Sequence, residues 1–254
     1  MPPKQAVPPL SRKGAGSLKI SGHMFFPEMR TACQLLALNK IEFTEDIVDL
    51  FSEAGTKEYA LLNPSEQIPT IIDDSQTIIG DSTHVYKYLC KTRNIPNKFY
   101  PSGTDMKQQR QQVDSILEWI QWQLRRCTKR IAKFKLTKAL IEKGFTTLTP
   151  QQKDQLQKEE AAEMELFNEV CLPNLEILLQ QARKYICGSE LSVADLAYYN
   201  ELVNVFGTLN AKLDERKFEH IKRWMDSIAK LPEVQKYEQQ FYDQVKKMEI
   251  EKPK

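Results

Sequence analysis

The chain has 254 residues, 41% of them hydrophobic, and its 36 Lys and Arg against 34 Asp and Glu leave a formal net charge of +2 at pH 7. This balance gives no electrostatic reason to expect a nucleic acid or an anionic membrane as a partner, and no apolar run approaches the roughly 18–20 residues that a membrane span needs. The five cysteines are scattered without a C-x-x-C pair and there are only three histidines, so we expect no disulfide framework, no metal site and a reducing, cytoplasmic compartment.

Short alternating or apolar runs dominate the first part of the chain. Residues 1–17 hold four Pro and three Lys or Arg, which is typical of a disordered tail. Strands are predicted over 18–21, 41–50, 69–73 and 76–79. Pro27 suits the first turn of a helix, and the last helix of this part is expected to start near Asp81. With a helix between the second and third strands, the expected order is strand, helix, strand, helix, strand, strand, helix.

The rest of the chain is predicted to be helical. We expect a long helix within 105–140, an interruption at 144–150, and a second long helix over about 151–183 that is kinked or broken at Pro173. Two or three shorter helices should come after it. The predicted domains are a tail at 1–17, an α/β domain at 18–93, a Pro- and Gly-containing linker at 94–104, an all-helical domain at 105–247 and a tail at 248–254.

Two motifs in the α/β part suggest a ligand site. The segment Asn63-Pro64-Ser65-Glu66-Gln67-Ile68-Pro69 places an X-Pro bond, whose cis form costs only about 0.5–1 kcal/mol, directly before a strand. A trans turn before an edge strand is the alternative. Gly80-Asp81-Ser82-Thr83 precedes a helix, where a hydroxyl and the first N–H groups bind anions. The alternative here is that Asp81 and Ser82 only cap the helix.

A third motif lies in the helical part. In Gly188-Ser189-Glu190-Leu191-Ser192-Val193-Ala194-Asp195-Leu196, Ser192 and Asp195 have the spacing of a capping box. Each side chain of such a pair satisfies a backbone N–H near the other residue. This pattern predicts a folding element and carries no chemistry of its own.

Together the three motifs resemble the glutathione S-transferase family, whose matching patterns are N-P-x-x-K/Q-V-P, E-S-x-A-I-x-x-Y-L and G-x-x-x-S/T-x-A-D-L. The resemblance covers about residues 18–245, and the runs Leu117-Glu118-Trp119 and Leu124-Arg125-Arg126-Cys127 look most like the theta class. It implies a thioredoxin-like N-terminal α/β domain followed by an all-α C-terminal domain. It also implies glutathione as co-substrate, without a metal, and a homodimer.

The resemblance assigns the ends of glutathione to particular residues. A cis Pro69 would turn the N–H and C=O of Ile68 toward the cysteinyl part of the tripeptide. Ser82 would bind the α-carboxylate of the γ-glutamyl group, and Asp81, where the family has Glu, would bind its ammonium.

Three further side chains are candidates by the same resemblance. Lys57, or Gln67 as a neutral donor, would meet the glycyl carboxylate of glutathione. Arg125 matches an arginine that lines the theta-class active site, although an exposed helix charge is the alternative interpretation.

The catalytic position departs from the family pattern. Theta-like members carry a Ser before the first helix, and the matching position here is Phe26, which cannot donate a hydrogen bond to a thiolate. Pro27 removes a helix N–H at this place, and Glu28 adds a negative charge. Ser21 and His23 are weak substitutes that need a rearranged loop, so the catalytic residue is left undetermined.

Two functions therefore stay open. The first is a glutathione transferase that joins the thiol to small electrophiles, as in detoxification. The second is a non-catalytic glutathione S-transferase-fold binding or scaffold subunit, favoured by Phe26. The electrophile itself is not predicted, and the candidate pocket residues Trp119, Trp122 and Phe134 are expected to be core instead.

Overall fold

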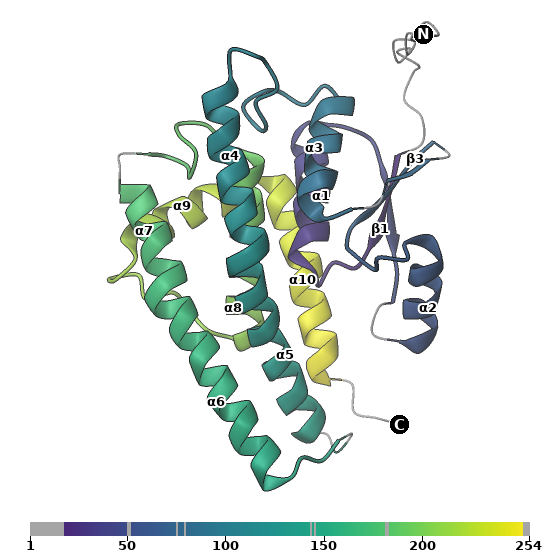
Figure 1. Cartoon of the computed structure of the whole chain (residues 1–254), viewed down its shortest axis with the longest axis vertical. Helices are drawn as coiled ribbons and strands as arrows, with labels where there is room; N and C mark the ends of the chain where they lie inside the picture. Colours follow the sequence, from purple (N-terminus) through teal and green to yellow (C-terminus); the bar gives the residue numbers. More distant parts are fainter. Residues whose placement is uncertain are drawn as a thin grey trace, which may run out of the picture.

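The computed structural model describes residues 18–250 except 50, 51, 75, 79, 143, 145, 181 and 182 (Figure 1). The predicted tail at 1–17 lies outside the described residues, as do residues 251–254. The last helix continues to Ile250, so the first three residues of the predicted 248–254 tail belong to it.

The N-terminal half is a four-stranded mixed sheet with three helices, in the predicted order. The sheet order is β2-β1-β3-β4, with β1 parallel to β2 and antiparallel to β3, and with β3 antiparallel to β4. Its elements are β1 (Leu18–Gly22), α1 (Pro27–Leu38), β2 (Thr44–Ile47), α2 (Glu53–Leu62), β3 (Thr70–Asp73), β4 (Gln76–Ile78) and α3 (Ser82–Thr92). Figure 1 shows α1 and α3 between the sheet and the helical half, with α2 on the opposite side of the sheet.

Local signals explain where these helices begin. Pro27 is the first residue of α1, where its missing N–H leaves no helical bond unmade. Asp81 is the N-cap of α3, and its Oδ1 accepts a 2.8 Å hydrogen bond from the backbone N–H of His84. Both starts agree with the sequence prediction.

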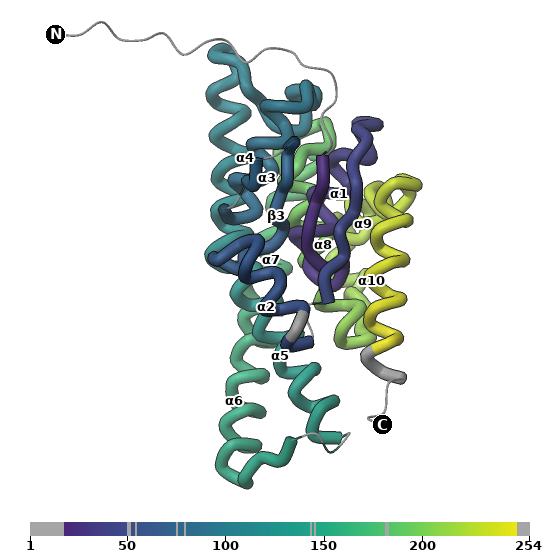
Figure 2. Tube along the Cα trace, turned by 90° about the vertical axis from the view of Figure 1, so that its right-hand side faces the viewer, coloured from purple at the N-terminus to yellow at the C-terminus, as the bar shows by residue number. Residues whose placement is uncertain are grey.

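The C-terminal half is all-helical. Its elements are α4 (Lys107–Trp119), the π-helical turn η1 (Ile120–Leu124), α5 (Arg125–Glu142), α6 (Pro150–Leu166), the π-helical turn η2 (Phe167–Cys171), α7 (Leu172–Gln180), α8 (Val193–Leu209), α9 (Glu219–Ala229) and α10 (Pro232–Ile250). In Figures 1 and 2 the far ends of α5 and α6 project beyond the sheet. The fold is thus a thioredoxin-like domain followed by an all-α domain.

The two predicted long helices each contain a π-helical turn. The first continues through η1 into α5, and the second changes pitch at η2, directly before Pro173 in the first turn of α7. Trp122 lies in η1 and is 76% exposed, so its expected place in the core is wrong. A π-turn adds a residue to one helical turn and rotates the later part of the helix, which the apolar spacing of the sequence does not reveal. Three helices of 17, 11 and 19 residues, α8, α9 and α10, follow α7 in the described part of the chain, in agreement with the two or three shorter helices predicted there.

Helix α8 and a buried arginine join the two halves. Arg30 of α1 is fully buried and donates to Asn200 Oδ1 at 3.1 Å and to the Asn200 carbonyl at 3.0 Å. It also donates to the carbonyl oxygens of Met24 and Phe25, at 2.7 and 2.9 Å. Its guanidinium lies 4.3 Å from the ring centre of Phe241, on the helix α10 that runs along α1 (Figure 2). The loop before α1 is therefore held by contacts from both halves of the chain.

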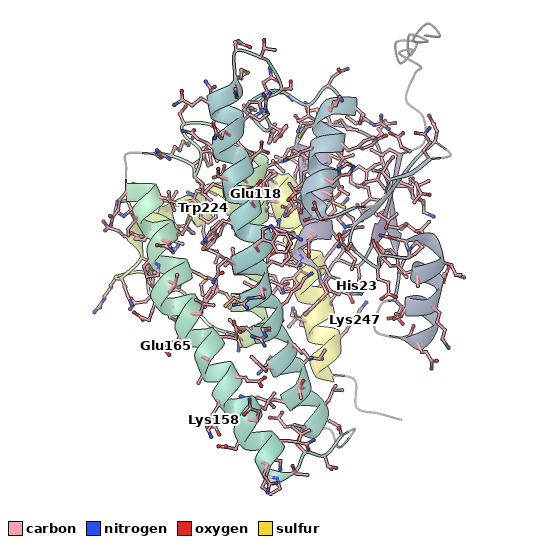
Figure 3. All side chains as sticks on the ribbon, in the orientation of Figure 1. His23, Glu118, Lys158, Glu165, Trp224 and Lys247 are labelled. Atoms are coloured by element: carbon pink, nitrogen blue, oxygen red, sulfur yellow. The ribbon has the colours of Figure 1, made fainter. Side chains whose placement is uncertain are left out.

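The predicted capping element is present at the start of α8. Asp195 accepts hydrogen bonds from the backbone N–H of Ser192 at 2.9 Å and from Ile186 at 2.8 Å. It also accepts a 2.9 Å bond from the indole N–H of Trp224, which is labelled in Figure 3. This buried carboxylate ties α8 to the preceding turn and to α9. Within the described residues, no helix combines the length and apolar character needed to cross a membrane.

Candidate glutathione site

A cavity of about 310 Å³ lies between the two halves of the chain. It is lined by Phe26, Glu28, Thr56, Tyr59, Glu66, Gln67, Ile68, Ser82, Gln121, Arg125 and Lys129. Four of the predicted site residues, Gln67, Ile68, Ser82 and Arg125, line this one cavity. The walls come from the first turns of α1 and α3, from α2, from the segment before β3, and from η1 and α5 of the helical half.

The segment before β3 has the predicted backbone conformation. The Ile68–Pro69 peptide bond is cis, and Ile68 lines the cavity. Two side chains from α2 and its C-terminus hold this turn: the Tyr59 hydroxyl and Asn63 Nδ2 each donate to the Gln67 carbonyl oxygen at 2.9 Å. Both donors act locally on the turn, and no sequence pattern singles out Tyr59.

The first turn of α3 contributes Ser82 to the cavity, while Asp81 caps the helix. Asp81 uses Oδ1 for the cap and is not among the residues that line the cavity. The Ser82 hydroxyl is buried and accepts a 2.7 Å hydrogen bond from Arg125 Nη1. Ser82, which is predicted to bind the γ-glutamyl carboxylate, therefore lines the cavity, whereas Asp81, which is predicted to bind the ammonium, does not.

Arg125 is the centre of an ion cluster at the base of the cavity. Its Nε lies 2.7 Å from Glu201 Oε1 on α8 and 3.2 Å from Glu28 Oε1 on α1. The ammonium of Lys129, one turn further along α5, lies 2.8 Å from the same oxygen of Glu28. Gln121 of η1 accepts a further bond from Arg125 Nη1. Two cations and two carboxylates from three helices are therefore in direct contact.

Glu28 is ionised in this environment. Burial by itself raises the pKa of Glu28, but Arg125 and Lys129 together outweigh burial, so the pKa lies below its ordinary value. Burial also lowers the pKa of Arg125, and Glu28 and Glu201 more than restore it, so the pKa of Arg125 is raised. Glu28 Oε2 is enclosed and has no hydrogen-bond partner among the described residues. The carboxylate is held through Oε1 alone.

Phe26 is the residue that the sequence resemblance matches to the family's catalytic hydroxyl position. It is the residue before α1, with φ −85° and ψ 128°, and it lines the cavity. Its ring contacts Phe25 and His23 edge to face, with ring centres 5.8 and 6.4 Å away. The wall of the cavity at the start of α1 is therefore aromatic at this point.

The two weak catalytic candidates lie elsewhere. Ser21 is buried in β1, and its hydroxyl donates to the carboxylate of Asp46 on β2. His23 is buried, and its Nδ1 accepts a 3.1 Å bond from the Phe25 N–H. Burial lowers the pKa of His23, and the neighbouring Lys247 of α10 lowers it further while Asp49 opposes the change (Figure 3). Neither Ser21 nor His23 is among the residues lining the cavity.

Lys57 is also outside the cavity wall. It is exposed on α2 and forms a 2.5 Å ion pair with Glu53, four residues earlier. Its chain neighbour Thr56 lines the cavity instead. Of the two residues proposed for the glycyl carboxylate, Gln67 is the one at the cavity.

The partners of Arg125 are not predicted by the sequence motifs. From the sequence, Glu28 is only an added negative charge at the start of α1, and no motif points to Lys129, Glu201 or Gln121. The four-residue spacing of Arg125 and Lys129 places both on one helix face, which is the one signal that could have found this pair.

All five cysteines are unpaired thiols, and the described residues contain no group of three His, Cys, Asp or Glu side chains arranged to hold a metal ion.

Comparisons with known proteins agree with this architecture. Residues 138–240 match the family model of the glutathione S-transferase C-terminal domain. The chain is 23% identical over 235 residues to a dichloromethane dehalogenase of Methylorubrum extorquens, an alignment that covers 91% of this chain and 78% of the dehalogenase. It is 29% identical over 170 residues to human glutathione S-transferase theta-1, covering 66% of this chain and 65%, slightly less than two thirds, of the human protein.

A solved structure shares the whole fold. The apo form of human glutathione S-transferase T1-1 superposes with a TM-score of 0.68 at 22% identity, covering 93% of this chain and 92% of the human chain. The sheet-containing domain followed by an all-helical domain is consistent with that likeness. The chain is therefore similar to the glutathione S-transferase family, in sequence over its C-terminal domain and in fold over almost its whole length, and theta-class proteins are among its relatives.

Proposed function

We propose that this protein binds glutathione in the cavity between its two domains and transfers the glutathione sulfur to small electrophilic compounds. The observation that carries the proposal is that Ile68, Ser82 and Arg125, from three separate segments, line one cavity. A backbone strand edge, a helix N-terminus and a guanidinium together match a peptide that ends in carboxylates.

The tripeptide is expected to lie across the cavity with its γ-glutamyl end at α3. Its α-carboxylate would accept hydrogen bonds from the Ser82 hydroxyl and from the first N–H groups of α3. The cysteinyl backbone would pair with Ile68, and Gln67 would donate to the glycyl carboxylate. Asp81 stays a proposed partner for the ammonium, through the carboxylate oxygen that does not cap the helix.

The thiol would then be directed to the start of α1, beside Phe26. In the transfer, the thiol proton passes to solvent and the thiolate forms a C–S bond with the electrophile as its leaving group departs. Small organic halides are the proposed class of electrophile, because one relative of the chain is a dichloromethane dehalogenase. We further propose a homodimer and a cytoplasmic location, which the unpaired thiols support.

The test is binding followed by turnover. The purified chain is titrated with glutathione in a calorimeter and assayed with a small alkyl halide and an aryl halide. Binding with turnover of either halide is expected. Binding without turnover would favour a non-catalytic glutathione-binding protein, and an absence of both would refute the proposal.

A further inference from the structure

Two cations on one face of α5 line the cavity, one helical turn apart. Arg125 contacts Ser82 at the start of α3, and Lys129 contacts Glu28 in the first turn of α1. Four residues of helix correspond to a rise of about 6 Å. The cavity thus offers one positive group at the α3 end and a second at the α1 end, where Phe26 stands.

The Lys129 ammonium is available to a ligand. Its side chain is 53% exposed, whereas those of Arg125 and Glu28 are 6% and 3% exposed. An ammonium has three N–H donors, and the contact with Glu28 Oε1 engages one of them. Lys129 therefore has N–H donors left for a ligand, whereas the Glu28 side chain, which also lines the cavity, is almost fully buried.

The charge of Glu28 does not cancel this effect. Glu28 Oε1 is shared between Lys129 and Arg125, so its negative charge is compensated from two sides. The second carboxylate of the cluster, Glu201, is engaged by Arg125 and by the Thr128 hydroxyl, and it is not a lining residue. At the α1 end of the cavity, the exposed charged group of this ion cluster is therefore the Lys129 ammonium.

We propose that Lys129 is the residue that stabilises the glutathione thiolate, in the role that a hydroxyl at the Phe26 position has in theta-like relatives. The inference rests on the proposed function and adds a catalytic residue to it. The thiol proton leaves to solvent, and the sulfur anion accepts a hydrogen bond from Lys129 Nζ. When the thiolate attacks an alkyl halide, the C–S bond forms, the carbon–halogen bond breaks and halide leaves with the electron pair.

The direct measurement is the pKa of the bound thiol, read from the ultraviolet absorbance of the thiolate while the pH is varied at saturating glutathione. In the wild-type protein this pKa is expected about one unit below that of free glutathione, because a neighbouring cation favours the thiolate. Lys129→Met is expected to remove most of that difference. At pH 6.5 it should lower the conjugation rate about tenfold, since one pKa unit is a tenfold change in thiolate.

A matched control and a rescue sharpen the test. Lys133→Met makes the same change one turn further along α5, at an exposed residue outside the cavity wall, and is expected to leave the thiol pKa unchanged. Lys129→Arg keeps the charge and should keep the lowered pKa. Adding Phe26→Ser to Lys129→Met should restore it, because the new hydroxyl takes over the hydrogen bond.

The outcomes separate this inference from the proposed function. Glutathione bound by the wild-type protein with an unshifted thiol pKa would overturn the role of Lys129 without any variant, and would leave glutathione binding intact. An equal pKa in wild type and folded Lys129→Met would do the same. A wild-type protein that does not bind glutathione at all would instead refute the proposed function, and the inference with it.

Discussion

The guanidinium of Arg125, on the helical domain, donates a 2.7 Å hydrogen bond to the hydroxyl of Ser82, on the sheet domain. Both groups are buried, and both line the cavity between the domains. The helix N-terminus that the sequence marks as an anion site is therefore linked to a cation from the other domain. Binding at α3 and the position of α5 are expected to depend on one another.

Ser82→Ala is expected to weaken glutathione binding about tenfold or more. A hydrogen bond to a charged group contributes about 1.5–3 kcal/mol, and the variant loses that bond to the γ-glutamyl carboxylate. The measurement is the dissociation constant from calorimetry. Ser115→Ala on α4, whose exposed hydroxyl bonds only to the Gln111 carbonyl, is the control and should bind like wild type. An unchanged constant in Ser82→Ala would place the carboxylate elsewhere.

Phe26→Ser is expected to increase the conjugation rate at neutral pH by about tenfold, because a hydroxyl bonded to the sulfur anion lowers its pKa by about 1–2 units. Steady-state rates at saturating glutathione are the readout, together with the thiol pKa. Phe26→Ala is the control, since it removes the ring without adding a donor. A flat rate in Phe26→Ser with glutathione still bound would show that this is not the catalytic position.

Glu28→Gln tests the ion cluster through the pH dependence of stability. The pKa of Glu28 is lowered in the folded protein, so its ionised form stabilises the fold above the ordinary Glu pKa of about 4.3, and this contribution is lost as the pH falls through the lower folded value. The variant should be about 3 kcal/mol less stable than wild type at pH 7, because Arg125 and Lys129 lose a buried partner.

Urea unfolding between pH 3 and pH 7 measures the difference in free energy of unfolding between wild type and Glu28→Gln. This difference should become smaller only at the lowest pH values. Glu53→Gln is the matched control, because Glu53 also pairs with a lysine but is 83% exposed. The free energy of unfolding of Glu53→Gln should equal that of wild type at every pH measured. A constant gap between Glu28→Gln and wild type at every pH would contradict an ionised Glu28.

Arg30→Lys is expected to lower the free energy of unfolding by about 2–4 kcal/mol. Arg30 is fully buried and donates to carbonyl oxygens of Met24 and Phe25 and to Asn200, and a lysine cannot reproduce this fork of bonds. Arg126→Lys, at an exposed position of α5, is the control. Because the Arg30 bonds hold the loop that ends at Phe26, weaker glutathione binding should accompany the loss of stability. A variant as stable as wild type would rule out this structural role.

Much of the fold can be predicted from short segments of the sequence. Pro27 at a helix start, Asp81 as a cap, the Ser192–Asp195 pair and the X-Pro bond at Pro69 each act within a few residues. The physical reason is that capping, turn geometry and proline's fixed backbone angle depend mainly on near neighbours in the chain. Such features predict the order of elements, and the family resemblance of the motifs that contain them implies the two-domain architecture and the presence of Ile68 and Ser82 at the site.

Which side chains line the cavity depends instead on contacts between residues that are far apart in the chain. Ser21, a weak catalytic candidate, pairs with Asp46 on another strand, 25 residues further along the chain, and does not line the cavity. A π-helical turn exposes Trp122 and precedes Arg125.

By itself, the sequence determined that residue 26 is a Phe without a hydroxyl and, through its family resemblance, predicted the fold. It left the Ile68–Pro69 bond open between cis and trans, and the structure shows it to be cis. Only the tertiary structure decided that Glu28 joins Arg125 and Lys129 at the cavity, because α1 and α5 meet through packing that no local pattern encodes.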